Sequence, residues 1–207
     1  MTGPKTNNQA HQNPGETVCG IDEVGRGPLA GPVVAAAVIL PPGFDTTSLK
    51  DSKALTPEKR DLERARITAA GIPLGIGWVW PAEIDEINIH RAALLAMERA
   101  WRELREHHAA VVHLITETLV DGLHLPRGLE GPARAIVGGD GTVPAIMAAS
   151  IIAKTIRDEW MVDYSRRDDR YGFERHKGYP TAAHKAALQR YGPCPIHRRS
   201  FRGVVQE

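Results

Sequence analysis

The chain has 207 residues and a formal net charge of +1, with 42% apolar and 25% charged residues. This composition is ordinary for one globular domain, and no apolar run approaches the roughly 20 residues that a membrane-spanning helix needs. Two cysteines without CxxC spacing indicate neither a disulfide framework nor a zinc site, so a cytoplasmic location is expected. Because no apolar run is long enough, no membrane contact is expected. The polar residues 1–15 lack the apolar core of a signal peptide and are typical of a disordered tail.

The first half of the chain predicts strands followed by helices. Strands are expected over the short run that begins at Val18 and over residues 33–40, which are all apolar. Thr56 followed by Pro57 is typical of a helix start, and this helix should stop at Gly71. A third strand is expected within 71–80, and apolar residues at helical spacing then predict one long helix over about 84–106. Residues 107–114 are ambiguous.

Short strands alternate with helices in the second half. Strands are predicted at 118–121 and 135–137, and each of them ends in a glycine turn. Small residues within the expected helix 144–163 allow it to pack closely against a sheet, and a shorter helix is expected over 181–190. The pattern predicts an α/β fold: a mixed sheet with helices on its faces.

Residues 164–202 form a basic, aromatic stretch. They contain ten Lys or Arg and three acidic residues, a charge of +7, together with all four tyrosines of the chain. Cations suit phosphates and aromatic rings suit sugars and bases, so this stretch favours nucleic-acid binding. A solvated basic face with tyrosines in the core is the structural alternative.

Acidic residues recur where strands end. Asp22 and Glu23 follow a strand and precede a glycine-rich turn, Asp121 ends a later strand, and Asp140 lies in a glycine turn before a helix. Carboxylates gathered beyond strand ends suit Mg²⁺ or Mn²⁺, and two such ions can assist phosphodiester hydrolysis. Taken singly, Asp121 and Asp140 are more often a turn residue and a helix cap.

Three other motifs have weaker chemical meaning. The glycine turn 25–31 partly fits a dinucleotide fingerprint, but a simple tight turn explains it equally well. Lys154 and Arg157 share a helical face and could meet a phosphate or lie in solvent. Lys177 and Tyr179 are candidate phosphate and sugar contacts, whereas Cys194 and His197 have metal-like spacing without a second half.

Taken together, these segments resemble ribonuclease HII, the type 2 ribonuclease H family. The matching segments follow the family order and cover nearly the whole chain after about Val18; they are residues 22–40, 51–60, 87–100, 120–122, 138–161, 171–181 and 191–201. The resemblance implies a ribonuclease H-like mixed five-stranded sheet flanked by helices, over residues 16–163. It also implies a small C-terminal helical extension, over 164–207, that helps to bind the duplex.

The implied activity is endonucleolytic cleavage of the RNA strand of RNA–DNA hybrids and nicking 5′ of a single ribonucleotide in duplex DNA, in ribonucleotide removal and primer removal. The resemblance implies a monomer with two divalent ions, Mn²⁺ or Mg²⁺, held by Asp22, Glu23, Asp121 and Asp140. It assigns the ribose 2′-OH contact to Gly25, Arg26 and Gly27, and the neighbouring deoxyribose to Tyr179. Lys53, Lys154 and Lys177 are expected phosphate contacts.

Two positions depart from the family pattern: Gly138 stands where a lysine is usual, and Leu123 where an asparagine is frequent. Three other classes remain as alternatives: a non-catalytic nucleic-acid-binding module, a dinucleotide-dependent oxidoreductase and a DNA nuclease of the same fold. Only the ribonuclease needs both the carboxylates and a ribose reader.

Overall fold

The computed structural model describes residues 16–49 and 55–204. Five strands form one sheet in the order β3-β2-β1-β4-β5. β1 pairs antiparallel with β2 and parallel with β4, β2 pairs antiparallel with β3, and β4 pairs parallel with β5. The predicted mixed five-stranded sheet is therefore confirmed. The strands are β1 (Val18–Val24), β2 (Val33–Leu40), β3 (Leu74–Val79), β4 (Glu117–Asp121) and β5 (Ala133–Ile136).

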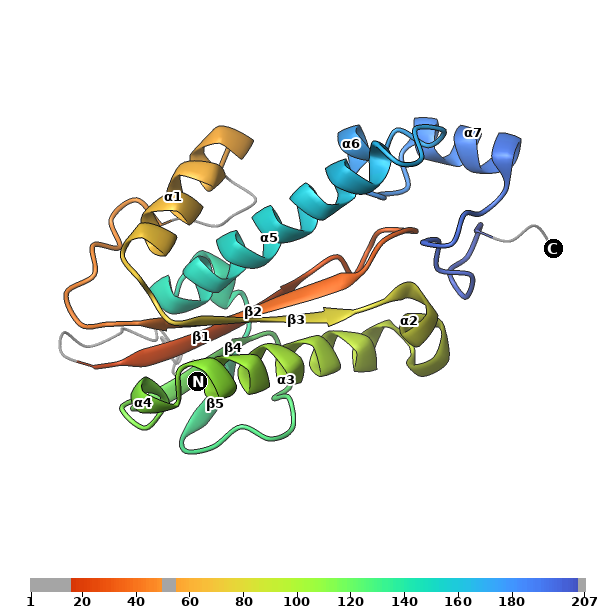
Figure 1. Cartoon of the computed structure of the whole chain (residues 1–207). Coiled ribbons are helices and arrows are strands. Elements are labelled where there is room, and N and C mark those ends of the chain that lie inside the picture. Colours follow the sequence, from red (N-terminus) through yellow and green to blue (C-terminus); the bar gives the residue numbers. More distant parts are fainter. Residues whose placement is uncertain (1–15, 50–54, 205–207) are drawn as a thin grey trace, which may run out of the picture.

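Helices cover both faces of the sheet (Figure 1). One core lies between the sheet and the helices α1 (Pro57–Ala69) and α5 (Pro144–Ser165). A second core lies on the other face, where α2 (Pro81–Ile87), α3 (Ile89–His107) and α4 (Ala109–Val112) pack. The short 3₁₀ helix η1 (Gly139–Gly141) precedes α5.

The C-terminal part continues from the end of α5 with α6 (Phe173–His176) and α7 (Ala182–Tyr191) (Figure 1). It has an apolar core of its own, which includes Tyr171, Phe173 and Leu188. Leu29 and Ala30, from the glycine turn between β1 and β2, belong to that same core. The C-terminal part is thus packed directly on the turn that follows the acidic pair.

Glycines let the two helical layers approach the sheet. A Cβ atom on Gly20 of β1 would lie 2.1 Å from the carbonyl carbon of Ala145 in α5, and one on Gly77 of β3 would lie 1.8 Å from the oxygen of Ala96 in α3. Neither contact is possible for a real side chain, so these positions require glycine. The small residues of α5 are buried, so the close packing of this helix on the sheet that they predicted is confirmed.

One helix prediction was wrong. Residues 84–106 do not form a single helix, because Asn88 has a left-handed backbone with φ of 69° and separates α2 from α3. Its side-chain oxygen accepts hydrogen bonds from the backbone N–H groups of His90 and Arg91, at 3.0 and 3.1 Å, and so caps α3. With ψ of 163° this backbone lies outside the αL region, in a conformation that few residues other than glycine adopt. No helix in the described ranges is long and apolar enough to cross a membrane.

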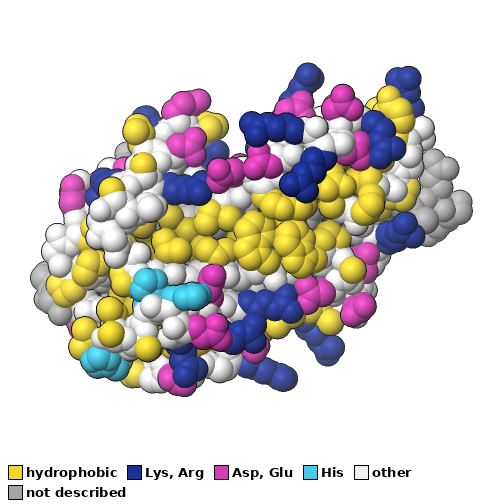
Figure 2. All heavy atoms as spheres, in the orientation of Figure 1, with side chains coloured by type: hydrophobic (Ala, Val, Ile, Leu, Met, Phe, Trp, Pro, Cys, Tyr) yellow, Lys and Arg dark blue, Asp and Glu magenta, His cyan; other side chains and the backbone are white. Residues whose placement is uncertain are grey.

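The edge strand β3 is covered by side chains of α3. Arg99 donates a hydrogen bond of 2.6 Å to the carbonyl of Trp78, and Glu103 accepts one from the backbone N–H of Ile76. Trp78 stacks on Trp80, and Trp80 contacts Trp160 of α5. Figure 2 shows apolar side chains gathered between the two helical layers on this side. The capped backbone groups limit pairing of this edge with another strand.

Candidate active site

Two parallel strands bring acidic residues to one end of the sheet. Ile21 of β1 pairs with Val120 of the parallel strand β4. The next residue on each strand is an aspartate, so Asp22 and Asp121 lie at the same end of the sheet. The Asp121 carboxylate accepts hydrogen bonds from the backbone N–H groups of Gly139 (2.7 Å) and Asp140 (3.3 Å). The η1 turn is thereby fixed beside the end of β4, with Asp140 in it.

Asp22 is the most buried of these acids, with 5% of its surface exposed. Burial, and then the charges of Glu23 and Asp121, raise the pKa of its carboxyl well above the usual value. Burial also raises the pKa of Glu23, although the neighbouring Arg26 opposes the shift. Arg26 donates a hydrogen bond of 3.2 Å to Glu23. The carboxylates of Asp22, Glu23 and Asp121 thus lie close enough to repel one another at a site that is partly shielded from solvent.

The chemistry of these donors fits a divalent cation. All are carboxylate oxygens, the ligands that Mg²⁺ and Mn²⁺ prefer, and a cation would relieve the repulsion that raises the pKa of Asp22. Glu23 and Asp121 line a small cavity of about 60 Å³, together with Arg26, His90 and His124. Within the described ranges, no three His, Cys, Asp or Glu side chains already form a group that could hold an ion. Side-chain rotation would therefore have to complete a metal site.

A buried arginine holds the glycine turn that follows the acidic pair. Arg198 is fully buried, and its guanidinium donates five hydrogen bonds, all to backbone carbonyls of this turn. The accepting residues are Gly25, Arg26, Pro28 and Gly31, at 2.6 to 3.1 Å. Burial lowers the pKa of Arg198 to about 9, so the group stays cationic at neutral pH. No sequence pattern distinguishes this arginine from the surface arginines around it.

A second arginine, Arg157, is also buried, contrary to the expectation that it meets a phosphate or lies in solvent. Arg157 meets neither solvent nor a phosphate, because it is fully buried. It donates hydrogen bonds to the carbonyls of Pro32 (2.9 Å), Ala30 (3.1 Å) and Lys177 (3.0 Å). Arg157 therefore joins the start of β2 to the loop that carries Tyr179.

Tyr179 lies beside the glycine turn. A Cβ atom on Gly27 would be 3.6 Å from a ring carbon of Tyr179, and 38% of the tyrosine surface is exposed. Gly178, before it, has φ of +86°, and its Cα faces the carbonyl of Ala30 so closely that a Cβ would lie 2.4 Å from that oxygen. The predicted ribose reader and the predicted sugar contact are thus neighbours in space, although about 150 residues separate them in sequence.

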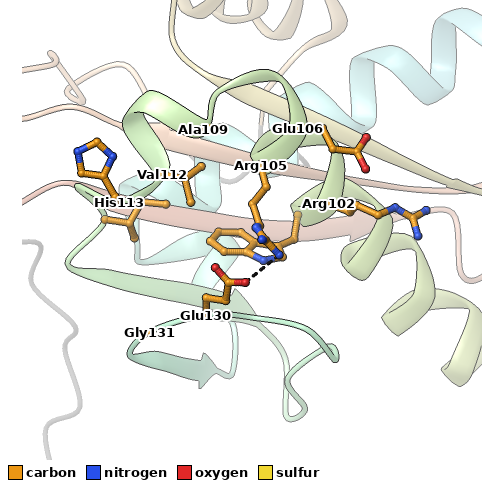
Figure 3. Close-up of a pocket in the computed structure, with 10 residues that line it drawn as sticks. Arg102, Arg105, Glu106, Ala109, Val112, His113, Glu130 and Gly131 are labelled. Carbon is orange, nitrogen blue, oxygen red and sulfur yellow. Dashed lines mark ion pairs between the residues drawn. The ribbon is translucent and has the colours of Figure 1, made fainter.

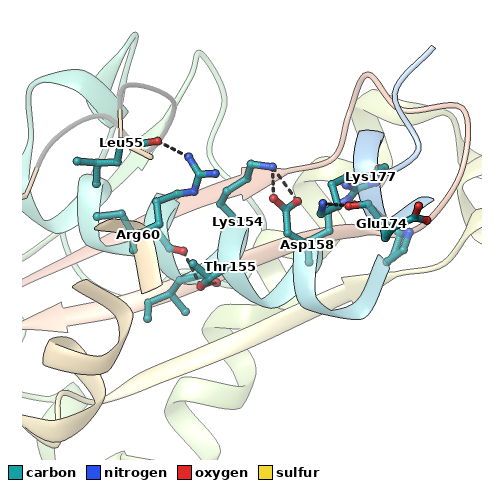
Figure 4. Close-up of polar contacts among 11 residues, drawn as sticks. Leu55, Arg60, Lys154, Thr155, Asp158, Glu174 and Lys177 are labelled. Atoms are coloured by element: carbon teal, nitrogen blue, oxygen red, sulfur yellow. Dashed lines mark hydrogen bonds and ion pairs between the residues drawn. The ribbon is translucent and has the colours of Figure 1, made fainter. Parts of the chain in front are cut away.

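Two of the three lysines expected to contact phosphates, Lys154 and Lys177, are shown in Figure 4 and have different surroundings. Lys154 is mostly buried and pairs with Asp158 at 2.5 Å, one helical turn along α5. Lys177 has a left-handed backbone, and its ammonium donates to the carbonyl of Glu174. Lys53 lies outside the described residues. The Asp158 carboxylate therefore neutralises Lys154.

Cys194 and His197 form part of a buried hydrogen-bonded chain. His197 accepts a hydrogen bond from the backbone N–H of Cys194 (3.0 Å), and its other ring nitrogen lies 3.0 Å from His184. Burial, and then His184, lower the pKa of His197 to about 4. Each nitrogen of His197 already has a protein partner.

Other cavities lie away from the carboxylates. One of about 650 Å³ is lined by the C-terminal half of α3, by α4 and by residues 130 and 131, and the Arg105–Glu130 ion pair of 2.9 Å spans it (Figure 3). Another, of about 870 Å³, runs between α1 and α5 and ends at Lys177. Size alone therefore does not indicate the active site, whereas the charged groups do.

Comparisons with known proteins identify the family. The family model "Ribonuclease HII" matches residues 19–204. The chain is 51% identical to the ribonuclease HII of Maricaulis maris, over 99% of this chain and 92% of that protein. It is 52% identical to the ribonuclease HII of Nitrosococcus oceani, over 92% and 90% of the two chains.

Solved structures show the same fold. The ribonuclease H2 of Pyrococcus horikoshii OT3 matches with a TM-score of 0.68 and 25% identity, over 91% of this chain and 95% of that one. Bst-RNase HIII in complex with Mn²⁺ matches with a TM-score of 0.78 and 18% identity, over 97% and 72%. Because the family model covers nearly the whole chain and curated relatives are about half identical to it, the chain belongs to the ribonuclease HII family and is a ribonuclease H.

Proposed function

We propose that this enzyme cleaves the RNA strand of RNA–DNA hybrids and nicks DNA 5′ of a single embedded ribonucleotide. The observation that carries the proposal is one juxtaposition: the glycine turn 25–31 follows the buried acidic pair directly and lies against Tyr179. A ribonuclease that acts on a single ribonucleotide must test one hydroxyl beside the phosphate that it cuts. The turn is next to the carboxylates in both sequence and space.

Each acidic residue has a role in this proposal. Asp22, Glu23, Asp121 and Asp140 would hold two divalent ions, Mn²⁺ or Mg²⁺, since a structural relative is a Mn²⁺ complex and the donors are all oxygens. When bound, such ions supply positive charge for the scissile phosphate and its leaving oxygen and lower the pKa of a water. The hydrogen bonds from Gly139 and Asp140 orient the Asp121 carboxylate before any substrate arrives.

The turn would recognise the ribose. Gly27 is exposed and leaves room for a sugar against the backbone, whereas Gly25 is packed so tightly on Arg157 that a Cβ would lie 2.3 Å from its Nε. Arg198 binds the carbonyls of the turn, so the turn keeps one shape. Arg26, half-exposed and paired with Glu23, links the reader to the acidic pair. Hydrolysis 5′ of the ribonucleotide would leave a 5′-phosphate on it and a 3′-hydroxyl on the preceding DNA.

Tyr179 would pack on the deoxyribose next to the ribonucleotide, and the basic stretch 164–202 would hold the duplex. Lys53, Lys154 and Lys177 remain candidates for phosphate contacts; Lys154 would first have to leave Asp158. We expect a monomer whose affinity for nucleic acid falls steeply with salt, because phosphate contacts release counterions. Removal of ribonucleotides and RNA primers from DNA would be its role.

Two duplexes of the same sequence test this function. One is all DNA, and the other carries a single ribonucleotide; each is incubated with the enzyme and Mn²⁺, and the end groups are mapped. We expect a nick 5′ of the ribonucleotide and no cleavage of the DNA control. Equal cleavage of both duplexes would indicate a DNA nuclease of the same fold, and binding without cleavage would indicate a non-catalytic module.

A variant tests the role of Tyr179. Tyr179→Ala should lower the cleavage rate of the single-ribonucleotide duplex roughly tenfold or more, because a misplaced sugar loses the attack geometry. Cleavage of a long uniform hybrid should fall much less. An equal loss on both substrates would show that Tyr179 has no special function at the junction.

A further inference from the structure

The segment Ile196–Arg198 runs beside the glycine turn. The backbone N–H of Gly31 donates to the carbonyl of Ile196 (2.9 Å), and that of Arg198 donates to the carbonyl of Leu29 (2.9 Å). Ala30 and His197 form an antiparallel bridge between these two hydrogen bonds. The segment therefore acts as a short partner strand for a turn that no strand of the main sheet pairs with at this point.

Two neighbouring side chains of this segment point to different sugar-contacting elements. The Arg198 guanidinium binds the carbonyls of the glycine turn, as described above. The His197 imidazole instead contacts His184 of α7, and His184 contacts the backbone carbonyl of Tyr179 at 2.9 Å. One rigid segment thus reaches both the ribose reader and Tyr179.

The hydrogen bonds in the histidine chain have only one consistent direction when both rings are neutral. A carbonyl oxygen only accepts, so Nδ1 of His184 must donate to Tyr179. Nε2 of His184 is then an acceptor, and Nε2 of His197 must donate to it. Nδ1 of His197 is left to accept the backbone N–H of Cys194. Burial, which lowers the pKa of both imidazoles, keeps them neutral.

We propose that Ile196–Arg198 is a positioning element that fixes Tyr179 relative to the glycine turn 25–31. Arg198 sets the turn, and His197, acting through His184, sets the backbone of Tyr179. The inference rests on the proposed function of Tyr179 and adds the residues that make it selective. His184 and His197 touch no substrate in this scheme, so their effect must pass through the tyrosine.

Two substitutions at His184 differ in whether they keep the hydrogen bond to the Tyr179 carbonyl. In His184→Asn the amide nitrogen takes the place of Nδ1 and can still donate to the Tyr179 carbonyl. In His184→Gln the longer side chain places its amide where Nε2 was, so the hydrogen bond to the Tyr179 carbonyl is lost. We expect His184→Gln to reduce single-turnover cleavage of the single-ribonucleotide duplex roughly tenfold, with a much smaller loss on a long hybrid. His184→Asn should restore most of the junction rate.

A double-mutant cycle shows whether His184 acts through Tyr179. His184→Gln added to Tyr179→Ala should cost less than about twofold, since the ring that it positions is already absent. Additive losses, equal losses on both substrates or equal behaviour of the Gln and Asn variants would overturn the proposal. If Tyr179→Ala itself is unselective, the proposed function of Tyr179 is wrong and this inference falls with it.

Two further variants keep the test decisive if His184→Gln does not fold. His197→Asn retains an acceptor for Cys194 but no donor for His184, and should reproduce the junction-selective loss. Arg198→Lys cannot reach the carbonyls on both sides of the turn, so it should slow junction and hybrid cleavage alike, by roughly tenfold or more in kcat. A shift in unfolding temperature in both variants with unchanged rates would show a merely structural role and overturn the proposal.

Discussion

The two sides of the candidate active site handle buried charge in opposite ways. At the strand ends, burial and then the charges of Glu23 and Asp121 raise the pKa of the Asp22 carboxyl. In the adjoining glycine turn, the guanidinium of Arg198 is buried too, but five hydrogen bonds to carbonyls compensate it. The strand ends hold carboxylates whose mutual repulsion a cation can relieve. The glycine turn is held in one shape by Arg198 before any ligand binds. Catalysis and recognition thus need different electrostatics.

The largest effect should come from the acidic side. Asp121→Asn removes one carboxylate charge but keeps an oxygen that can accept the hydrogen bonds of Gly139 and Asp140. We expect the rate of cleavage of the single-ribonucleotide duplex to fall at least 100-fold, since the site loses a charged metal ligand. Binding of the duplex, measured by fluorescence anisotropy without metal, should change little.

Asp45→Asn is the matched control for that variant. Asp45 is exposed, hydrogen-bonds Thr47 and lies outside the acidic group, so the same chemical change there should leave cleavage intact. Near-normal turnover by Asp121→Asn would refute the assignment of this residue to the metal site.

On the rigid side, the expected effect is on folding. Arg157→Met keeps an unbranched apolar stem but leaves the carbonyls of Ala30, Pro32 and Lys177 without this donor. An unsatisfied buried acceptor costs about 1–3 kcal/mol, whereas removal of a buried cation regains part of its desolvation. We expect the free energy of unfolding, from urea denaturation, to fall by about 3 kcal/mol.

Arg64→Met provides the comparison for a surface arginine. Arg64 forms an ion pair of 2.7 Å with Glu159, but both side chains are substantially exposed. Such pairs contribute less than about 1 kcal/mol. If Arg157→Met were no more destabilising than Arg64→Met, the carbonyl contacts of the buried arginine would not stabilise the fold.

The sequence predicted the repeating elements better than the breaks between them. The uniform apolar run gave β2 with its observed ends, and Thr56 caps α1 as expected, accepting from the backbone N–H of Lys59. The break at Asn88 was missed because apolar spacing continues across it, and a single left-handed residue leaves no trace in that spacing. Periodicity reports which face is buried, not whether one helix or two present it.

The candidate site shows the same limit. The acidic residues could be proposed because several carboxylates follow strand ends in one chain, and the family resemblance selected among them, although Asp121 or Asp140 alone is more often a turn residue or a helix cap. The buried positions of Arg157 and Arg198 could not be predicted, since a buried arginine and a surface arginine are the same letter in the sequence. What separates them is a cluster of carbonyls assembled by residues more than 100 positions away. Such partners exist only after folding.

The smallest predicted effect has the opposite sign to that of Arg157→Met. Asp22→Asn should raise the free energy of unfolding of the metal-free protein at pH 8, because it removes a carboxylate charge that burial and the charges of Glu23 and Asp121 disfavour. The pKa of Asp22 is raised in the folded state, so between its usual and its raised value the folded protein binds more protons than the unfolded chain. Stability of the wild type therefore falls as pH rises through that window, and the penalty is complete above it.

The pH and the metal dependence of this difference separate repulsion from other causes. The advantage of Asp22→Asn in urea unfolding should shrink at about pH 5, where the wild-type carboxyl is more protonated. Excess Mn²⁺ should stabilise the wild type, by about 2.7 kcal/mol at 100 times its dissociation constant, and the variant much less. The order of stability would then reverse. An advantage that stays constant with pH and Mn²⁺ would instead reflect packing at position 22, and the contrast between the two sides of the site would lose its electrostatic basis.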